Sequence, residues 1–249
     1  MQDINIIEEL LVEKGRILNY KELAQALSEY KDVNSKILSL SKKGFLVNLR
    51  RGVYYIAKLG SLGYTSISNY LIANIIGKKS FVSFESALKY HGIYDQGLKK
   101  IQSISQKQYL EKTIESITYE YIKVKNSNYF GFEEHKVDGG TARIATNERA
   151  ILDIIEYKRT VSNVSLVQEK LNNHIDEFDL ERLTFYAKNY SQTTIKTLGL
   201  VLDFIGKDTD KLNFQINKKS TSRISEGSDK FSNKWRLYYN SILEEYAHN

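Results

Sequence analysis

Five cationic side chains flank a short β-forming run near the start of the sequence. In KILSLSKKGFLVNLRRGVYYIA (36–57), Lys36, Lys42 and Lys43 precede the run, Arg50 and Arg51 follow it, and no acid is present. Residues 31–58 carry seven Lys or Arg against one acid, whereas residues 59–249 carry 26 against 23. Clustered lysine and arginine attract phosphate groups. A nucleic-acid contact is therefore expected in this small region.

Three helical patterns position these cations. Apolar residues recur at helical spacing from Ile4 to Leu11 and stop at Gly15, which predicts a first helix. Asn19, with Glu22 three positions later, forms a capping-box pattern that opens a second helix over 20–28. Asp32 is placed to cap a third helix that ends near residue 43. A strand, a basic turn and a second strand follow over 45–56.

This order of three helices and a two-stranded wing is typical of a winged helix-turn-helix. In that fold the third helix enters the DNA major groove while the wing reaches the backbone or minor groove. Charges at the helix end and wing tip can then meet phosphates on both sides of a groove. The predicted DNA-binding residues are Asn34, Ser35, Ser39, Lys42, Lys43, Asn48, Arg50 and Arg51.

Leu38 does not fit the core of the predicted third helix, because it points away from the face formed by Val33, Ile37 and Leu40. It would either pack on the second domain or touch a thymine methyl group. A winged helix used for protein contacts, with a basic rim kept for solubility, is the alternative interpretation of the whole region.

The rest of the chain predicts an α+β domain. The uncharged GSLGYTS (60–66) reads as a linker. Strand patterns at 101–105, 116–124, 129–137 and 142–145 predict a small antiparallel sheet, with a hairpin turn at Asp138-Gly139-Gly140. Helical patterns follow from Thr146 to Gly206, and the polar segment 213–233 reads as loop. Trp235, Leu237 and Tyr239 are expected to tie this tail to the body.

Several segments together resemble the AbiEi family, the antitoxins of bacterial type IV toxin–antitoxin and phage-defence systems. The matching segments, in order, are GVYYIA (52–57), ESALKYHG (85–92), TNERAIL (146–152), TLGLVLDFIG (197–206) and SNKWRLYYN (232–240). They span most of the chain.

The resemblance implies an antitoxin that represses its own operon by binding inverted repeats in double-stranded DNA at its promoter. It also implies a C-terminal domain that counteracts a nucleotidyltransferase-like toxin, with or without direct contact. The expected organisation is α+β: a winged helix-turn-helix domain over 1–58 and a second domain over 59–249. Within the second domain we expect a sheet region over about 80–146, a helical bundle over about 147–206 and a C-terminal segment over 207–249.

The sequence offers little for catalysis or metal binding. It contains no cysteine, and its four histidines, His91, His135, His174 and His248, show no ligand spacing. We therefore expect no enzyme activity, no metal and no cofactor. The enzyme alternative is a metal-dependent nuclease in which Glu120 joins the Glu134-His135-Lys136 triplet to hold magnesium and activate water.

The remaining composition predicts a cytoplasmic protein. No stretch approaches the roughly 20 apolar residues of a membrane span. The first residues, MQDINIIEELLVEKG, place acids among apolar residues and lack the basic start of a signal peptide.

Overall fold

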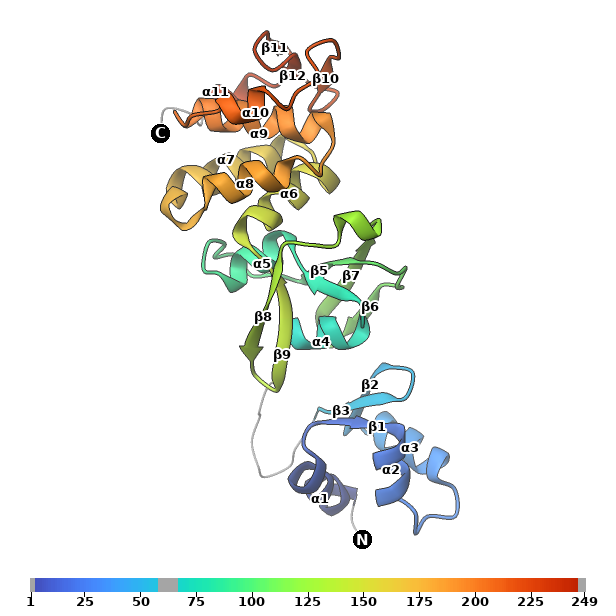
Figure 1. Cartoon of the computed structure of the whole chain (residues 1–249). Helices are drawn as coiled ribbons and strands as arrows, with labels where there is room; N and C mark the ends of the chain where they lie inside the picture. Colours follow the sequence, from blue (N-terminus) through green and yellow to red (C-terminus); the bar gives the residue numbers. More distant parts are fainter. Residues whose placement is uncertain (1–2, 58–66, 246–249) are drawn as a thin grey trace.

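A computed structural model describes residues 3–57 and 67–245, and its N-terminal part combines helices with a small sheet (Figure 1). The sheet has the order β1-β3-β2 and is antiparallel. The elements are α1 (Asp3–Lys14), β1 (Ile17–Asn19), α2 (Tyr20–Ala26), α3 (Val33–Lys42), β2 (Leu46–Arg50) and β3 (Val53–Ile56). The predicted linker at 60–66 lies outside the described residues.

Local caps fix the helices of this part. The Asn19 side chain accepts from the Glu22 backbone N–H while the Glu22 carboxylate accepts from Asn19, which completes the predicted capping box. Asp32 caps α3 in the same way, through the backbone N–H of Ser35. Buried apolar side chains from all three helices and from the sheet form a separate small core: Ile6, Ile7, Leu10, Leu18, Leu23, Leu27, Ile37, Leu40, Leu46 and Ile56.

The body of the protein is built on a mixed six-stranded sheet with the order β6-β7-β5-β4-β9-β8. β5 pairs in parallel with β7, and β4 in parallel with β9, so the predicted antiparallel sheet is wrong. Helix α4 (Asn69–Ile76) packs on one face and α5 (Phe84–Tyr90) on the other (Figure 1). The strands are β4 (Ser80–Val82), β5 (Lys100–Ser105), β6 (Lys112–Ile114), β7 (Ile117–Lys123), β8 (Phe132–Val137) and β9 (Gly140–Ala145).

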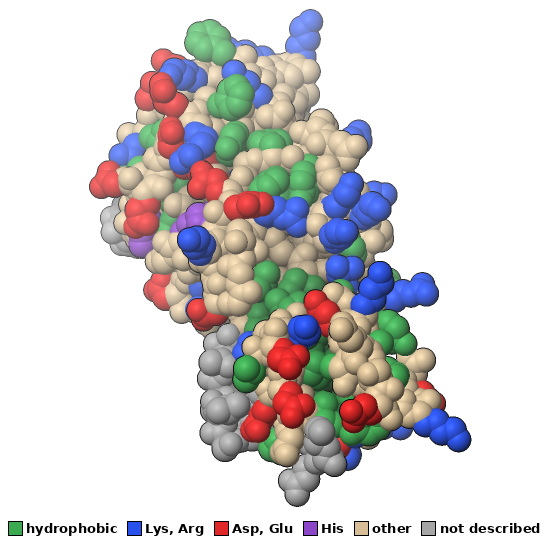
Figure 2. Space-filling view, turned by 60° about the horizontal axis from the view of Figure 1, so that its bottom comes forward, with side chains coloured by type: hydrophobic (Ala, Val, Ile, Leu, Met, Phe, Trp, Pro, Cys, Tyr) green, Lys and Arg blue, Asp and Glu red, His purple; other side chains and the backbone are tan. Residues whose placement is uncertain are grey.

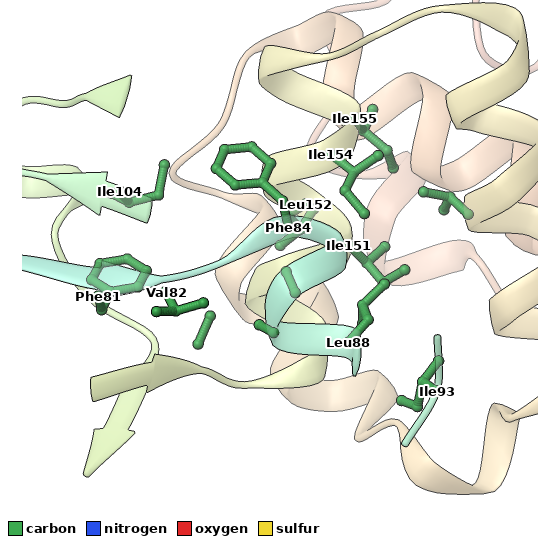
Figure 3. Close-up of a cluster of buried hydrophobic side chains, with 14 of the residues drawn as sticks. Phe81, Val82, Phe84, Leu88, Ile93, Ile104, Ile151, Leu152, Ile154 and Ile155 are labelled. Carbon is green, nitrogen blue, oxygen red and sulfur yellow. The ribbon is translucent and has the colours of Figure 1, made fainter. Parts of the chain in front are cut away.

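Four helices follow the sheet and share its core. They are α6 (Asn147–Tyr157), α7 (Val161–Asn173), α8 (Leu180–Ala187) and α9 (Gln192–Phe204), with a 3-10 turn at Ile175–Glu177. A second 3-10 turn, Asn126–Asn128, lies between β7 and β8 of the sheet. Figure 3 shows Phe84 and Leu88 of α5 beside Ile151 and Ile154 of α6. Phe81 and Val82 of β4 and Ile104 of β5 continue the cluster into the sheet. Sheet and helices therefore bury one continuous apolar cluster, which gives an α+β architecture.

The C-terminal segment is more ordered than its polar sequence predicts. It contains α10 (Asp210–Asn213), β10 (Ser222–Arg223), β11 (Lys230–Ser232), β12 (Leu237–Tyr239) and α11 (Ile242–Glu245). Trp235, Leu237 and Tyr239 are buried, as expected. An added Cβ at Gly199 of α9 would lie 2.1 Å from the Trp235 ring, so this glycine admits the indole.

Among the described residues, no helix is long and apolar enough to cross a membrane.

Candidate nucleic-acid interface

The outer face of α3 carries most of the predicted contact residues. Asn34 and Ser35 are exposed in its first turn, Ser39 is half-buried in the middle, and Lys42 and Lys43 are exposed at its end. Ser35, Leu38, Ser39, Lys42 and Lys43 together line a shallow open hollow. The face therefore combines small polar side chains with cations at one end.

The first turn of this face is held by nearby side chains. The Asp32 carboxylate accepts from the Ser35 backbone N–H at 3.0 Å and from the Ser35 hydroxyl at 2.7 Å. These bonds lower the pKa of Asp32. The Tyr20 hydroxyl donates to Asn34 Oδ1 at 2.9 Å, so the amide oxygen of the exposed Asn34 is engaged and its NH₂ group is the part left to donate. The start of α3 is thus ordered before any ligand arrives.

The two lysines at the end of α3 differ in their surroundings. Lys43 Nζ lies 2.5 Å from Asp3 of α1, and Lys36 Nζ lies 2.7 Å from the same carboxylate. Hydrogen bonds from Lys36 and Lys43 lower the pKa of Asp3. Within the described part of the chain, Lys42 has no carboxylate at ion-pair distance. Lys42 is therefore the more available cation, and Asp3 offsets part of the charge of Lys43.

The β2–β3 hairpin separates its two arginines. Arg50 pairs with Val53, so Arg51 and Gly52 form a two-residue turn, and Gly52 has a φ of +71°. Arg51 is exposed at this tip, whereas Arg50 is half-buried and its Nε makes no hydrogen bond to a described residue. Arg50 lines a hollow toward the body, together with Lys78 and Arg143.

Asn48 lies on β2 beside Arg50 and away from the predicted contact residues of α3. Its side chain donates to the Arg50 backbone oxygen at 3.0 Å. Lys112 of β6 donates to the Asn48 backbone oxygen at 2.7 Å. Asn48 therefore lies at the junction with the body, and it does not share a face with the contact residues of α3.

Charge is distributed unevenly over the N-terminal part. Its acids include Glu8, Glu9 and Glu13, all on α1. In Figure 2, carboxylates gather in the middle of the lower lobe, while Lys and Arg side chains lie at its edge and along the adjoining flank of the body. An anionic duplex would be repelled by the first surface and attracted by the second.

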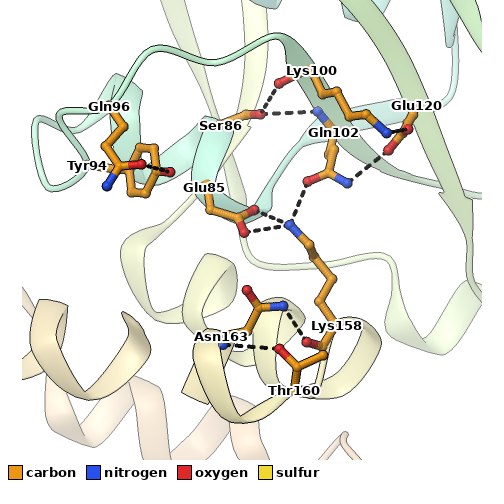
Figure 4. Close-up of polar contacts among 10 residues, drawn as sticks. All are labelled: Glu85, Ser86, Tyr94, Gln96, Lys100, Gln102, Glu120, Lys158, Thr160 and Asn163. Carbon is orange, nitrogen blue, oxygen red and sulfur yellow. Dashed lines mark hydrogen bonds and ion pairs between the residues drawn. The ribbon is translucent and has the colours of Figure 1, made fainter. Parts of the chain in front are cut away.

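The residues of the nuclease alternative are not brought together. Glu120 lies on β7 and Glu134 on β8, with β5, β4 and β9 between them in the sheet. At about 4.8 Å per strand this is a separation of roughly 19 Å. Glu120 accepts from Gln102 and Lys100 in a network that also joins Lys158 to Glu85 (Figure 4).

The histidines and other ionisable groups also form no metal site in the described part of the chain. His91 Nε2 lies 2.8 Å from the Ala145 backbone oxygen, and burial lowers its pKa. It therefore donates as a neutral ring where α5 meets β9. His248 lies outside the described residues.

Sequence reasoning missed Asp3, Tyr20 and Lys112. Each acts on a predicted contact residue from at least 14 positions away: Tyr20 on Asn34, Asp3 on Lys43, and Lys112 on Asn48. No spacing rule connects such pairs, and only the packing of α1, α2 and β6 around α3 and β2 creates them.

Comparison with known proteins shows the fold and no function. No family model and no curated protein matches the sequence. The crystal structure of the RV2827C protein from Mycobacterium tuberculosis aligns with a TM-score of 0.67 and 13% sequence identity, over 97% of this chain and 92% of that one. The likeness thus extends over both the N-terminal part and the body.

Proposed function

We propose that this protein is a DNA-binding antitoxin that represses its own operon, as its resemblance to the AbiEi family implies. The N-terminal part, residues 1–58, would act as a winged helix-turn-helix with α3 as recognition helix. The observation that carries the proposal is the outer face of α3, where exposed Asn34 and Ser35 lie at one end and Lys42 at the other.

Each group on this surface has a role that fits duplex DNA. Short side chains let a helix approach base edges closely, and the NH₂ group of the exposed Asn34 can donate to a base acceptor. Lys42 and Arg51 are exposed cations at the end of α3 and at the hairpin tip, where they meet phosphates of the flanking backbone. Asn48 is left out of this proposal because Lys112 engages it.

The antitoxin role rests on the resemblance alone. By this resemblance, residues 59–249 would counteract a nucleotidyltransferase-like toxin in the cytoplasm. These residues comprise the sheet, the helical bundle and the C-terminal segment. Coexpression with such a gene from the same locus tests this role. Restored growth supports the proposal, and growth arrest despite full expression of this protein contradicts it.

The DNA-binding role is tested by titrating the protein with its own promoter DNA at several salt concentrations. The variant combines Lys42→Ala with Arg51→Ala and removes two expected phosphate contacts. Its affinity should fall and the slope of log K against log salt should become shallower by about 1.8, since each contact contributes about 0.9.

The control is Lys14→Ala, which removes an exposed cation from the end of α1. Its slope should equal that of the wild type. Equal slopes for the wild type and the double variant would exclude Lys42 and Arg51 from the interface, and no binding by the wild type at low salt would exclude the DNA-binding role.

A further inference from the structure

The centre of the exposed face of α3 is apolar. Leu38 is 56% exposed, whereas Ile37 and Leu40 of the same helix are buried in the N-terminal core and Val33 packs half-buried against it. Asn34 lies four positions before it and Lys42 four positions after it, so all three share one stripe along the helix. Leu38 therefore occupies the middle of the proposed DNA-binding surface.

The structure removes one of two explanations for this leucine. Among the described residues, Leu38 lines an open hollow formed by α3 residues and Lys43, and no residue from 67–245 contributes to it. Leu38 therefore does not pack on the second domain. Single exposed leucines are common on soluble proteins, so the exposure alone carries no inference. The inference rests instead on the position of Leu38 between polar and cationic groups.

The neighbours of Leu38 select the kind of partner. Ser35, Ser39, Lys42 and Lys43 surround it. In the described part of the chain no carboxylate lines this hollow, because Asp32 and Asp3, which pair with Ser35 and Lys43, are not among its lining residues. An apolar group ringed by hydroxyls and cations is complementary to a polyanion that presents isolated methyl groups. In the DNA major groove, the C5-methyl of thymine is that group, and it distinguishes T·A from the other base pairs.

We propose that Leu38 contacts the C5-methyl group of a thymine and so contributes sequence specificity to the recognition helix. The proposal rests on the proposed DNA-binding function and deepens it. It assigns Leu38 to base readout, whereas Lys42 and Arg51 contact phosphates.

The contact can be tested without knowing where the operator lies. The DNA upstream of the protein's own gene is amplified once with dTTP and once with dUTP, which removes every C5-methyl group. Burying one methyl-sized group stabilises a complex by a factor of about four. Wild-type affinity should therefore fall about fourfold for each methyl contacted when uracil replaces thymine.

The variant is Leu38→Ala, which is expected to fold because the side chain is mostly exposed. It should bind thymine-containing DNA about as weakly as the wild type binds uracil-containing DNA, and its affinity should be the same for both. Its salt slope should equal that of the wild type, because no phosphate contact is lost. The matched control is Val12→Ala, which trims an apolar residue of α1 that is 81% exposed; it should keep the wild-type difference between the two DNAs.

The outcomes distinguish a failure of the methyl contact from a failure of the proposed DNA-binding function. Equal wild-type affinity for both DNAs overturns the methyl contact and leaves DNA binding intact. An equal loss for wild type and Leu38→Ala also overturns it, because the uracil effect then acts through DNA shape. Absence of wild-type binding to the thymine-containing fragment overturns the DNA-binding function and this proposal together.

Discussion

At the residue scale, Asp3 sets the charge that α3 can present. Its carboxylate lies within 2.7 Å of Lys36 and 2.5 Å of Lys43, so two cations of the basic segment share one acid. The Lys43 side chain is 56% exposed, and the pair therefore contributes little stability. Its consequence is electrostatic, because Asp3 lies beside the surface proposed to meet phosphates.

Asp3→Asn should therefore strengthen DNA binding. Lys43 would be released to contact a phosphate, and the affinity for promoter DNA should rise about two- to fivefold with a salt slope steeper by about 0.9. Stability should also fall in urea titrations, by about 1–2 kcal/mol, because the variant breaks the Asp3–Lys36 pair, whose side chains are only 18% and 16% exposed. Glu9→Gln is the control, because it removes an equal charge from an exposed site on the same helix. The same gain from both variants would reduce the effect to net charge and contradict a specific role for Asp3.

At the scale of elements, a buried ion pair in α6 connects the sheet region to the helices. The Asp153 carboxylate accepts from Ser83 Oγ at 2.6 Å, Arg149 Nε at 3.0 Å and the Tyr190 hydroxyl at 2.7 Å. Burial raises the pKa of Asp153, whereas Asp153 raises the pKa of Arg149 against the effect of burial. The pair is ionised, because a guanidinium keeps its proton and needs a counter-charge when it is buried.

Asp153→Asn should be strongly destabilising. It leaves the Arg149 guanidinium buried without its anion, and such a change costs about 3–5 kcal/mol. Urea unfolding followed by circular dichroism measures the loss. Glu181→Gln breaks an ion pair with Lys211 in which both side chains are largely exposed, and should change stability by no more than about 1 kcal/mol. Similar effects from the two variants would show that the buried pair has no special role.

Helix ends were predictable from sequence to a degree that the strands were not. Asn19 and Asp32 begin their helices where predicted, because a cap is a contact between residues three apart. β1, β4 and β6 were missed, since each has three residues and shows no usable alternation. Their partners lie far along the chain; β1, for example, pairs with β3 through Ile17 and Tyr55.

The direction of strand pairing was unpredictable for the same reason. The predicted antiparallel sheet is wrong because β4 inserts between β5 and β9 and pairs in parallel with β9, and no local pattern in the sequence signals that pairing. At the candidate site, exposure of Lys42 and Arg51 followed from local pattern. The engagement of Asn48 did not, because it depends on Lys112 from the body.

At the scale of the whole molecule, the N-terminal part is attached to the body through residues of β2 and β3, the strands of its hairpin. It has a core of its own, yet Leu49 and Tyr55 belong to the large apolar cluster of the body. Lys112 Nζ donates to the backbone oxygens of Asn48 and Leu49 at 2.7 and 3.0 Å. The Tyr55 hydroxyl donates to Glu115 at 2.8 Å, and burial raises the pKa of Tyr55. These contacts fix the hairpin that carries Arg51.

Lys112→Ala should loosen this attachment without unfolding either part. The ammonium is half-buried and burial lowers its pKa, so its two hydrogen bonds to backbone oxygens are worth about 1–2 kcal/mol of coupling. Calorimetry should show one unfolding transition for the wild type and two for the variant, with the smaller N-terminal part unfolding first. Lys107→Ala removes an exposed lysine from the loop before β6 and should leave one transition. If Lys112→Ala also keeps a single transition at the wild-type temperature, the attachment depends on Leu49 and Tyr55 packing alone, and the orientation of the hairpin does not depend on Lys112.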